Sequence, residues 1–216
     1  MEALGAVLLA ATPLLLMAIV LWTENGWSGG YSWADNNISD LGNVSCGFFD
    51  GRDICSPRHL VFNIGVLALG CLVGSAVLLT WHAWGRGKGA TLARTCILLA
   101  AVGYVLVGAF PADVNLGMHL LAALFVTPVA NIGLLASGFV GRTSALWKMR
   151  WISRALGAVA FVGSYLHFFG PWLGIGKGGM ERIAVFTLLF WCGGIGAFLS
   201  RRAWQSRAEV APHLTD

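Results

Sequence analysis

The chain has few charged residues. Only 11% of its 216 residues are Asp, Glu, Lys or Arg, whereas about 25% of a soluble domain is charged because its surface must face water. This shortage excludes an ordinary soluble globular protein. The sequence also lacks a Cys-x-x-Cys pair, which argues against a thiol oxidoreductase. It has no internal repeat, low-complexity tract or linker that would divide it into domains.

Apolar residues take the place of the missing charge. They make up 57% of the chain, the mean hydropathy is +0.73, and the sequence has 29 Gly and many Trp, which are typical of packed membrane helices and bilayer interfaces. A helix needs about 20 mostly apolar residues to cross a bilayer. We therefore predict an all-α polytopic membrane protein, a single domain over residues 1–216 with a bundle of six transmembrane helices. The predicted spans, none of which contains Asp, Glu, Lys or Arg, are about 4–22, 60–81, 95–112, 116–140, 155–176 and 183–200.

Basic residues in the connections predict the orientation, because cytoplasmic loops are enriched in Lys and Arg. The connections after the second and fourth spans and the C-terminal tail hold Arg86, Lys88, Arg94, Arg142, Lys148, Arg150, Arg154, Arg201, Arg202 and Arg207. The other connections hold only Arg52, Arg58, Lys177 and Arg182. We therefore expect both termini in the cytoplasm and a multi-pass protein of the plasma (cytoplasmic) membrane. The net charge of +4 reflects this orientation, and no nucleic-acid partner is expected.

The long connection, residues 23–59, is expected on the outer, oxidising side of the membrane. It contains Cys46 and Cys55, for which we predict a disulfide. Closing so short a loop would contribute about 2–3 kcal/mol. Their Cα atoms should then lie about 4.4–6.8 Å apart.

Polar residues within the predicted spans are costly in hydrocarbon, so their positions are informative. At four-residue steps the fourth span has His119, Ala123, Thr127 and Asn131, a small and polar stripe that should face the bundle. A similar stripe in the fifth span consists of Ala160, Gly163, Ser164 and His167. Asn63 lies about one turn into the second span. Asn63, His119 and His167 are therefore expected at similar depth below the outer surface.

The outer connections place further polar groups above this level. They are Ser39, Asp40, Arg58, Asp113, Glu181 and Arg182. Each has a structural explanation as well, because membrane histidines are most often hydrogen-bonded packing residues, and Ser39-Asp40 or Asp113 can cap a turn or helix. Since separate connections converge at one depth, we predict one cavity open to the outer leaflet. It should contain Asp40, Asp113, His119 and Arg182, with Asn63 and His167 on its wall.

Three short motifs at these positions resemble a known family. They are Asn37-Ile-Ser39-Asp40-Leu-Gly42, Phe110-Pro111-x-Asp113 followed by His119, and Gly179-x-x-Arg182. Over essentially its whole length the chain resembles a bacterial and archaeal six-helix membrane family known as domain of unknown function 998. That family is similar in layout to the Frag/DRAM/Sfk-type membrane proteins, some of which are linked to lipid and lipid-anchor remodelling. The resemblance implies six spans but no reaction. It marks Ser39, Asp40, Asn63, Asp113, His119, Glu181 and Arg182 as positions that match the family pattern.

The first functional hypothesis is a hydrolase or transferase acting on lipid head groups. Its catalytic candidates are Ser39, Asp40, Asp113, His119 and His167, and its substrate-binding candidates are Asn63, Arg58, Glu181 and Arg182. The candidate ligands of a Zn²⁺ that would acidify a bound water are Asp40, Asp113, His119 and His167. Without a metal, His119 would act as general base, and Arg58 and Arg182 would hold a phosphate.

Two other hypotheses do not require a reaction. The chain could bind or transport a lipid or small molecule, or it could be a haem or quinone protein that uses His119 and His167 as ligands. Membrane lipid is the expected partner. The sequence favours a lipid-related role without deciding between an enzyme and a binding protein.

Overall fold

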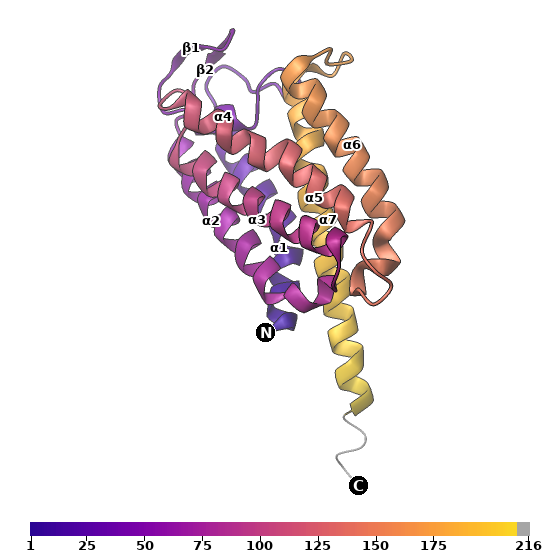
Figure 1. Cartoon of the computed structure of the whole chain (residues 1–216). Coiled ribbons are helices and arrows are strands. Elements are labelled where there is room, and N and C mark those ends of the chain that lie inside the picture. Colours follow the sequence, from indigo (N-terminus) through magenta and orange to yellow (C-terminus); the bar gives the residue numbers. More distant parts are fainter. Residues whose placement is uncertain (211–216) are drawn as a thin grey trace.

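The computed structural model describes residues 1–210 (Figure 1). Its helices are α1 (Glu2–Glu24), α2 (His59–Leu79), α3 (Lys88–Ala109), α4 (Leu116–Leu124), α5 (Ala130–Ser137), α6 (Arg150–Phe169) and α7 (Gly176–Val210). A π-helical turn, η3 (Phe125–Val129), joins α4 to α5, and short 3₁₀ segments are η1 (Ser39–Gly42), η2 (Trp81–Trp84) and η4 (Ala145–Met149). Strands β1 (Gly47–Phe49) and β2 (Arg52–Ile54) pair antiparallel.

The protein is an all-α polytopic membrane bundle, as predicted. The described chain contains 6 helices long and apolar enough to cross a membrane. The segments α4, η3 and α5 together form one of them, Leu116–Ser137. The number of spans is readable from the sequence because each span is a local run of apolar residues.

The third helix begins earlier than predicted. Helix α3 starts at Lys88 and not at residue 95, so Arg94 lies inside it and is buried. The Arg94 guanidinium donates to the carbonyl oxygens of Trp81 (3.0 Å) and Gly85 (3.1 Å) and lies over the Trp81 ring. A long basic side chain near a helix end can reach polar groups in this way, which is why the helix tolerates its charge.

The last two spans also differ from the predicted ranges. Helix α6 covers Arg150–Phe169, where 155–176 was predicted, because the chain turns at Gly170 with a φ of +60°. Helix α7 begins at Gly176 and not at residue 183. Glu181 and Arg182 are therefore helical and buried, and do not belong to a connection. The fourth span ends at Ser137, three residues before the predicted 140.

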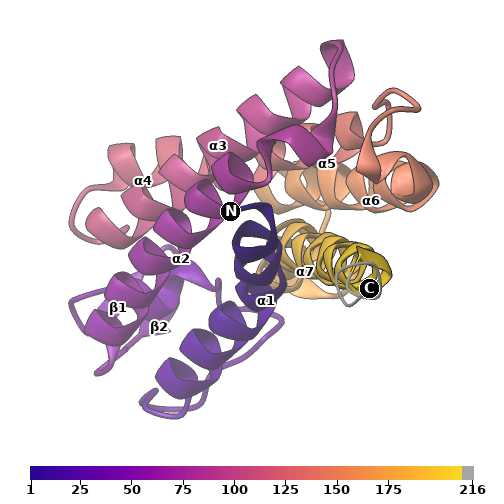
Figure 2. The same ribbon diagram turned by 90° about the horizontal axis from the view of Figure 1, so that it is seen from below.

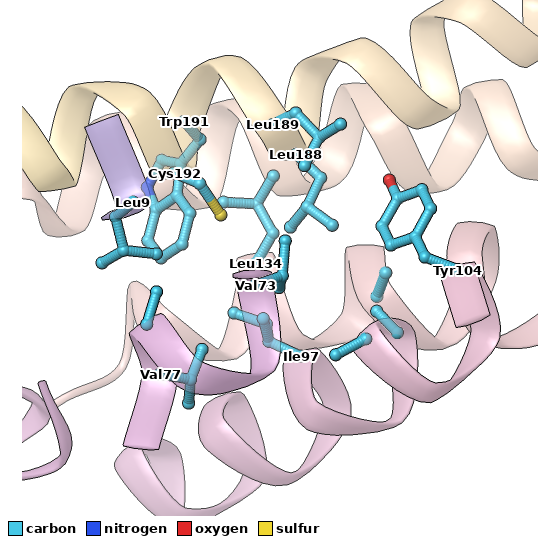
Figure 3. Close-up of a cluster of buried hydrophobic side chains, with 14 of the residues drawn as sticks. Leu9, Val73, Val77, Ile97, Tyr104, Leu134, Leu188, Leu189, Trp191 and Cys192 are labelled. Carbon is cyan, nitrogen blue, oxygen red and sulfur yellow. The ribbon is translucent and has the colours of Figure 1, made fainter. Parts of the chain in front are cut away.

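Spans that follow one another in sequence pack side by side in a closed ring. Helix α1 packs on α2, α2 on α3, α3 on α5, α5 on α6 and α6 on α7, and α7 returns to α1 (Figure 2). Small residues permit close approach. For example, a Cβ at Gly70 of α2 would lie 2.6 Å from the carbonyl oxygen of Ala101 in α3. Apolar side chains from α1, α2, α3, α5 and α7 fill the interior (Figure 3).

The two polar stripes predicted from the sequence face the interior. His119, Thr127 and Asn131 are buried in the fourth span, and Ala160, Gly163, Ser164 and His167 are buried in α6. The Asn131 amide Nδ2 donates to Ser164 Oγ (2.8 Å), to the Ala184 carbonyl (3.0 Å) and to the Ala160 carbonyl (3.1 Å). These bonds connect α5 to α6 and α7, which is how polar side chains orient helices in a membrane.

The fourth span is interrupted at η3. Pro128 has no N–H to complete the helical hydrogen-bond ladder, and the π-helical turn accommodates the disruption. On the N-terminal side of this turn, α4 lies apart from α6. Helix α6 packs on α5, η3 and α7. Figure 1 shows α4 and α6 diverging away from the chain termini.

Loop residues 25–58 fold over the ring at the end remote from the start of α1 and the end of α7 (Figure 1). We call this the hairpin end, and the opposite one the terminal end. In the β-hairpin, Asp50 and Gly51 have φ values of +48° and +77°, as a tight hairpin turn requires. The predicted Cys46–Cys55 disulfide is present, with Cα atoms 4.2 Å apart. That is slightly less than the expected range of about 4.4–6.8 Å.

We expect the terminal end to be cytoplasmic, because most Lys and Arg residues lie there. Single cysteines introduced by Thr143→Cys at the terminal end and Asp53→Cys at the hairpin end would test this, since both positions are exposed. In intact cells a membrane-impermeant maleimide should label the Asp53→Cys protein, and the Thr143→Cys protein only after lysis. The unsubstituted protein serves as background, and the reverse pattern would show the opposite orientation.

Candidate functional site

A cavity of about 470 Å³ lies at the hairpin end, between the loop and the helices. We call it the hairpin-end cavity. Its wall is apolar on the side of the bundle, where it is lined by Leu16, Phe62, Val66, Val107, Val126 and Val185. On the side of the loop it is polar, and Ser39, Asp40, Arg52, His119, His167 and Glu181 line it. One cavity therefore joins an apolar and a strongly polar compartment.

The apolar compartment contains one unusual polar group. Tyr104 of α3 lines the cavity and is 2% exposed. Its hydroxyl is buried and has no hydrogen-bond partner in residues 1–210. Figure 3 shows the hydroxyl directed from α3 toward α7. A buried hydroxyl without a partner is costly, which suggests that a ligand or water completes this part of the cavity.

The cavity reaches the outside of the bundle along α4. Leu116 and Leu120 line it although they are 50% and 47% exposed. Phe168 of α6, which is half-buried, lines it from the opposite side. Partly exposed apolar side chains of α4 and α6 thus border the cavity on the side where these helices diverge (Figure 1). We call this side of the cavity the lateral opening.

A chain of ion pairs crosses the polar side of the cavity. The Arg52 guanidinium donates to Asp40 with Nε to Oδ2 and Nη2 to Oδ1, both at 3.1 Å. Its Nη1 reaches Asp50 Oδ2 (3.2 Å), which also accepts from Lys177 Nζ (2.6 Å). Asp40 Oδ2 further accepts from the backbone N–H of Asn37 (2.8 Å). The chain links the start of η1, the hairpin and the start of α7.

The two carboxyl groups in this chain are shifted in opposite directions. Burial raises the pKa of Asp40, and the nearby negative charge of Glu181 acts in the same direction, while Arg52 opposes both. Partial burial also acts to raise the pKa of Asp50, but the hydrogen bond and charge of Lys177, with help from Arg52, outweigh it and lower this pKa. Of these two carboxyl groups, Asp40 therefore depends more on its basic partner, Arg52, to remain ionised.

Both predicted histidines line the cavity. The Nδ1 atom of His119 lies 2.9 Å from the carbonyl oxygen of Phe110, and that of His167 lies 3.1 Å from the carbonyl oxygen of Lys177. A carbonyl oxygen only accepts, so Nδ1 carries the proton and donates in each ring. In the neutral imidazole Nε2 is then an acceptor, and neither Nε2 has a partner among the described residues.

Glu181 lies on the cavity wall at 8% exposure. Its Oε2 accepts a short hydrogen bond from the backbone N–H of Ile38. Together with the Asp40 bond to Asn37, this bond holds the N–H groups just before η1, where negative charge is favourable. Glu181 forms no ion pair with any Lys, Arg or His in the part of the chain that the structure describes.

Two predicted site residues lie off the cavity wall. Asp113 is half-buried and accepts from the backbone N–H groups of Val44 (3.0 Å) and Ser45 (2.8 Å), so it anchors the loop beside the hairpin. Asn63 donates from Nδ2 to the carbonyl oxygen of Gly42 (2.9 Å) and holds the end of η1. The sequence placed both near the cavity but could not show that the backbone takes up their polar atoms.

The two predicted arginines also bind protein and not the cavity. Arg58 donates to the carbonyl oxygen of Trp22 (2.8 Å) and lies over the Trp22 ring. Arg182 donates from Nη1 to the carbonyl oxygens of Trp33 (2.8 Å), Asn36 (2.8 Å) and Gly178 (2.9 Å), and from Nη2 to the hydroxyl of Tyr31 (2.6 Å). Neither arginine lines the cavity, and the role of Arg58 and Arg182 in holding a substrate phosphate stays a prediction.

Among residues 1–210, the side chains on the cavity wall form neither a three-ligand metal site nor a histidine–carboxylate pair. Within residues 1–210 no three His, Cys, Asp or Glu side chains come together as metal ligands, so the candidate zinc set does not fit the geometry. The Nδ1 atom of each histidine is bonded to a backbone carbonyl and not to a carboxylate. Asp40 is bonded to Arg52 and not to a histidine. We derive no catalytic step from these residues.

Comparison with protein families gives a match over most of the chain. The model of a family described as "Protein of unknown function (DUF998)" matches residues 4–197. The chain belongs to this family. Searches among curated proteins and among solved structures returned no match. The family assignment confirms the resemblance seen in the loop and helix motifs, and it leaves the function to be argued from the cavity.

Besides Tyr104, the sequence interpretation missed three charged residues of this DUF998 cavity. They are Asp50, Arg52 and Lys177. A signal for the first two was present, because Asp50-Gly51 flanked by Phe49 and a further strand is a strong hairpin pattern. That pattern, within the predicted disulfide loop, would have placed Arg52 on a strand. No comparable local signal identifies Lys177, whose partner Asp50 lies 127 residues away.

Proposed function

We propose that this membrane protein binds an amphipathic lipid in the hairpin-end cavity. The observation that carries the proposal is the division of one cavity into an apolar and a polar compartment. Acyl chains fit against the aliphatic side chains of α1, α2, α3 and α7, and a head group fits below the loop. A volume of about 470 Å³ is in the usual range of small-molecule sites and suits part of a lipid.

The lateral opening supports a lipid over a water-soluble ligand. Leu116 and Leu120 are exposed side chains of a membrane-spanning helix, so lipid is what surrounds them. A ligand that approaches between α4 and α6 arrives from the bilayer and not from water. Its chains can remain in the apolar compartment while its head group reaches the polar one.

The proposal assigns the hairpin end to the outer face of the cytoplasmic membrane, which the distribution of Lys and Arg and the disulfide support. The lipid then comes from the outer leaflet. We favour binding over hydrolysis or group transfer, because neither histidine is hydrogen-bonded to Asp40. Each histidine donates to a backbone carbonyl oxygen, and Asp40 accepts from Arg52.

The direct test is the lipid content of the purified protein. In mild detergent without added lipid, we expect about one lipid molecule to remain per chain, because the cavity holds its head group and part of its acyl chains. Native mass spectrometry measures this stoichiometry, and extraction with liquid chromatography identifies the lipid. A protein that carries no lipid and shows no saturable binding of added lipid would contradict the proposal.

A further inference from the structure

Charge on the cavity wall is almost completely neutralised by protein. Arg52 is bonded to both Asp40 and Asp50, and Lys177 is bonded to Asp50. The nitrogen atoms Nε, Nη1 and Nη2 of Arg52 therefore all face carboxylate oxygens. Both basic side chains are therefore already paired with carboxylates of the protein.

Glu181 is the exception. It lines the cavity at 8% exposure, and its Oε2 is bonded only to the neutral N–H of Ile38. Its Oε1 has no hydrogen-bond partner in the described chain. The adjacent Arg182 does not compensate this charge, because it is surrounded by three carbonyl oxygens and the Tyr31 hydroxyl. A buried carboxylate without a cation is costly, and a cationic ligand would remove that cost.

Several other groups on the wall can also accept a hydrogen bond from a ligand. With Nδ1 donating to a carbonyl, each imidazole of His119 and His167 presents an acceptor at Nε2 whenever that ring is neutral. The Ser39 hydroxyl also lines the cavity and can accept. A carboxylate oxygen, two imidazole nitrogens and a hydroxyl are complementary to a ligand that donates hydrogen bonds.

We propose that the cavity selects amphiphiles whose head group carries a protonated amine, with Glu181 as the counter-charge. This rests on the proposed lipid-binding function and narrows it to a ligand class. A primary ammonium has three donors and a positive charge, so it can bond to Glu181 and to neighbouring acceptors at once. A phosphate without an amine would instead meet the unpaired Glu181 carboxylate and two Nε2 acceptors.

The contribution of the head group is measured with three amphiphiles that share the same alkyl chain: hexadecylamine, hexadecanol and hexadecyl phosphate. Each is titrated into the full-length protein in non-ionic detergent, and native mass spectrometry counts the bound molecules. We expect hexadecylamine to bind roughly tenfold more tightly than the other two, the increment of a charge-assisted hydrogen bond. Glu181→Gln keeps an acceptor for Ile38 N–H but removes the charge, so it should abolish this preference while hexadecanol still binds.

Glu24→Gln is the matched control. Glu24 lies at the same end of the bundle, and its carboxylate accepts from Trp33 Nε1 outside the cavity. Its substitution changes the net charge by the same amount as Glu181→Gln. This variant should keep the preference for the amine. If hexadecanol and hexadecylamine bind equally to the unsubstituted protein, or the phosphate binds best, the inference is overturned and lipid binding stands. If none of the three binds and the purified protein also carries no lipid, the proposed function fails as well. The probe series on the unsubstituted protein decides both points, even if Glu181→Gln does not fold.

Discussion

Replacing Arg52 by methionine is expected to lower the free energy of unfolding by about 3 kcal/mol, because it leaves a buried carboxylate without its cation. The side chain of Asp40 is 3% exposed and depends on the two-pronged Arg52 bond at 3.1 Å. Thermal unfolding in detergent measures the loss. Asp53→Asn, one residue along the same strand and exposed, is the matched control and should leave the midpoint unchanged.

The size of this loss should depend on pH. Burial already raises the pKa of Asp40, and removal of Arg52 should raise it further. A carboxyl group with a raised pKa in the folded state favours folding when protonated, and this contribution disappears as the pH rises through that pKa. The Arg52→Met protein should therefore come closest to the unsubstituted protein in acid and lose stability as the pH increases.

The double variant Asp40→Asn with Arg52→Met tests the cause. Asparagine retains an acceptor for the Asn37 N–H but carries no charge, so the second substitution should recover most of the stability lost with the first. If the double variant is as unstable as Arg52→Met alone, the loss arises from packing of the arginine stem and not from the unpaired carboxylate.

Filling the cavity should have the largest effect on binding. Ala123 of α4 lines the cavity near the π-helical turn and is half-buried. The indole of Ala123→Trp would occupy the apolar compartment that we assign to the acyl chains. We expect the retained lipid to be lost and the affinity for added lipid to fall at least about a hundredfold, which corresponds to roughly 2.7 kcal/mol. Thermal stability should change little, because an aromatic ring in an apolar cavity gains contacts.

Leu124→Trp is the control for this substitution. Leu124 follows Ala123 on the same helix but is 46% exposed on the outside of the bundle and does not line the cavity. Its replacement should leave retained lipid and affinity unchanged. If Ala123→Trp still binds lipid at full stoichiometry, the ligand does not occupy the hairpin-end cavity.

The sequence determined the features that depend on nearby residues. The number of spans follows from runs of apolar residues, and the inward stripes of His119 to Asn131 and Ala160 to His167 follow from helical spacing. The disulfide joins cysteines only 9 residues apart. The last span was predicted to begin at residue 183, later than the start of α7 at Gly176, and this error also has a local cause. Glu181 and Arg182 resemble loop residues unless their buried partners are known.

Only the tertiary structure decided which polar groups face the cavity. Four residues, Asp113, Asn63, Arg58 and Arg182, are as polar as Asp40 and His119, but backbone groups of the folded loop and of α1 take up their hydrogen bonds. Glu181 meets Ile38 across 143 residues of sequence, and Lys177 meets Asp50 across 127. A polar residue near a membrane surface must find a partner, but its sequence neighbours do not specify whether that partner is the protein backbone or a ligand, because the competing groups come from distant parts of the chain.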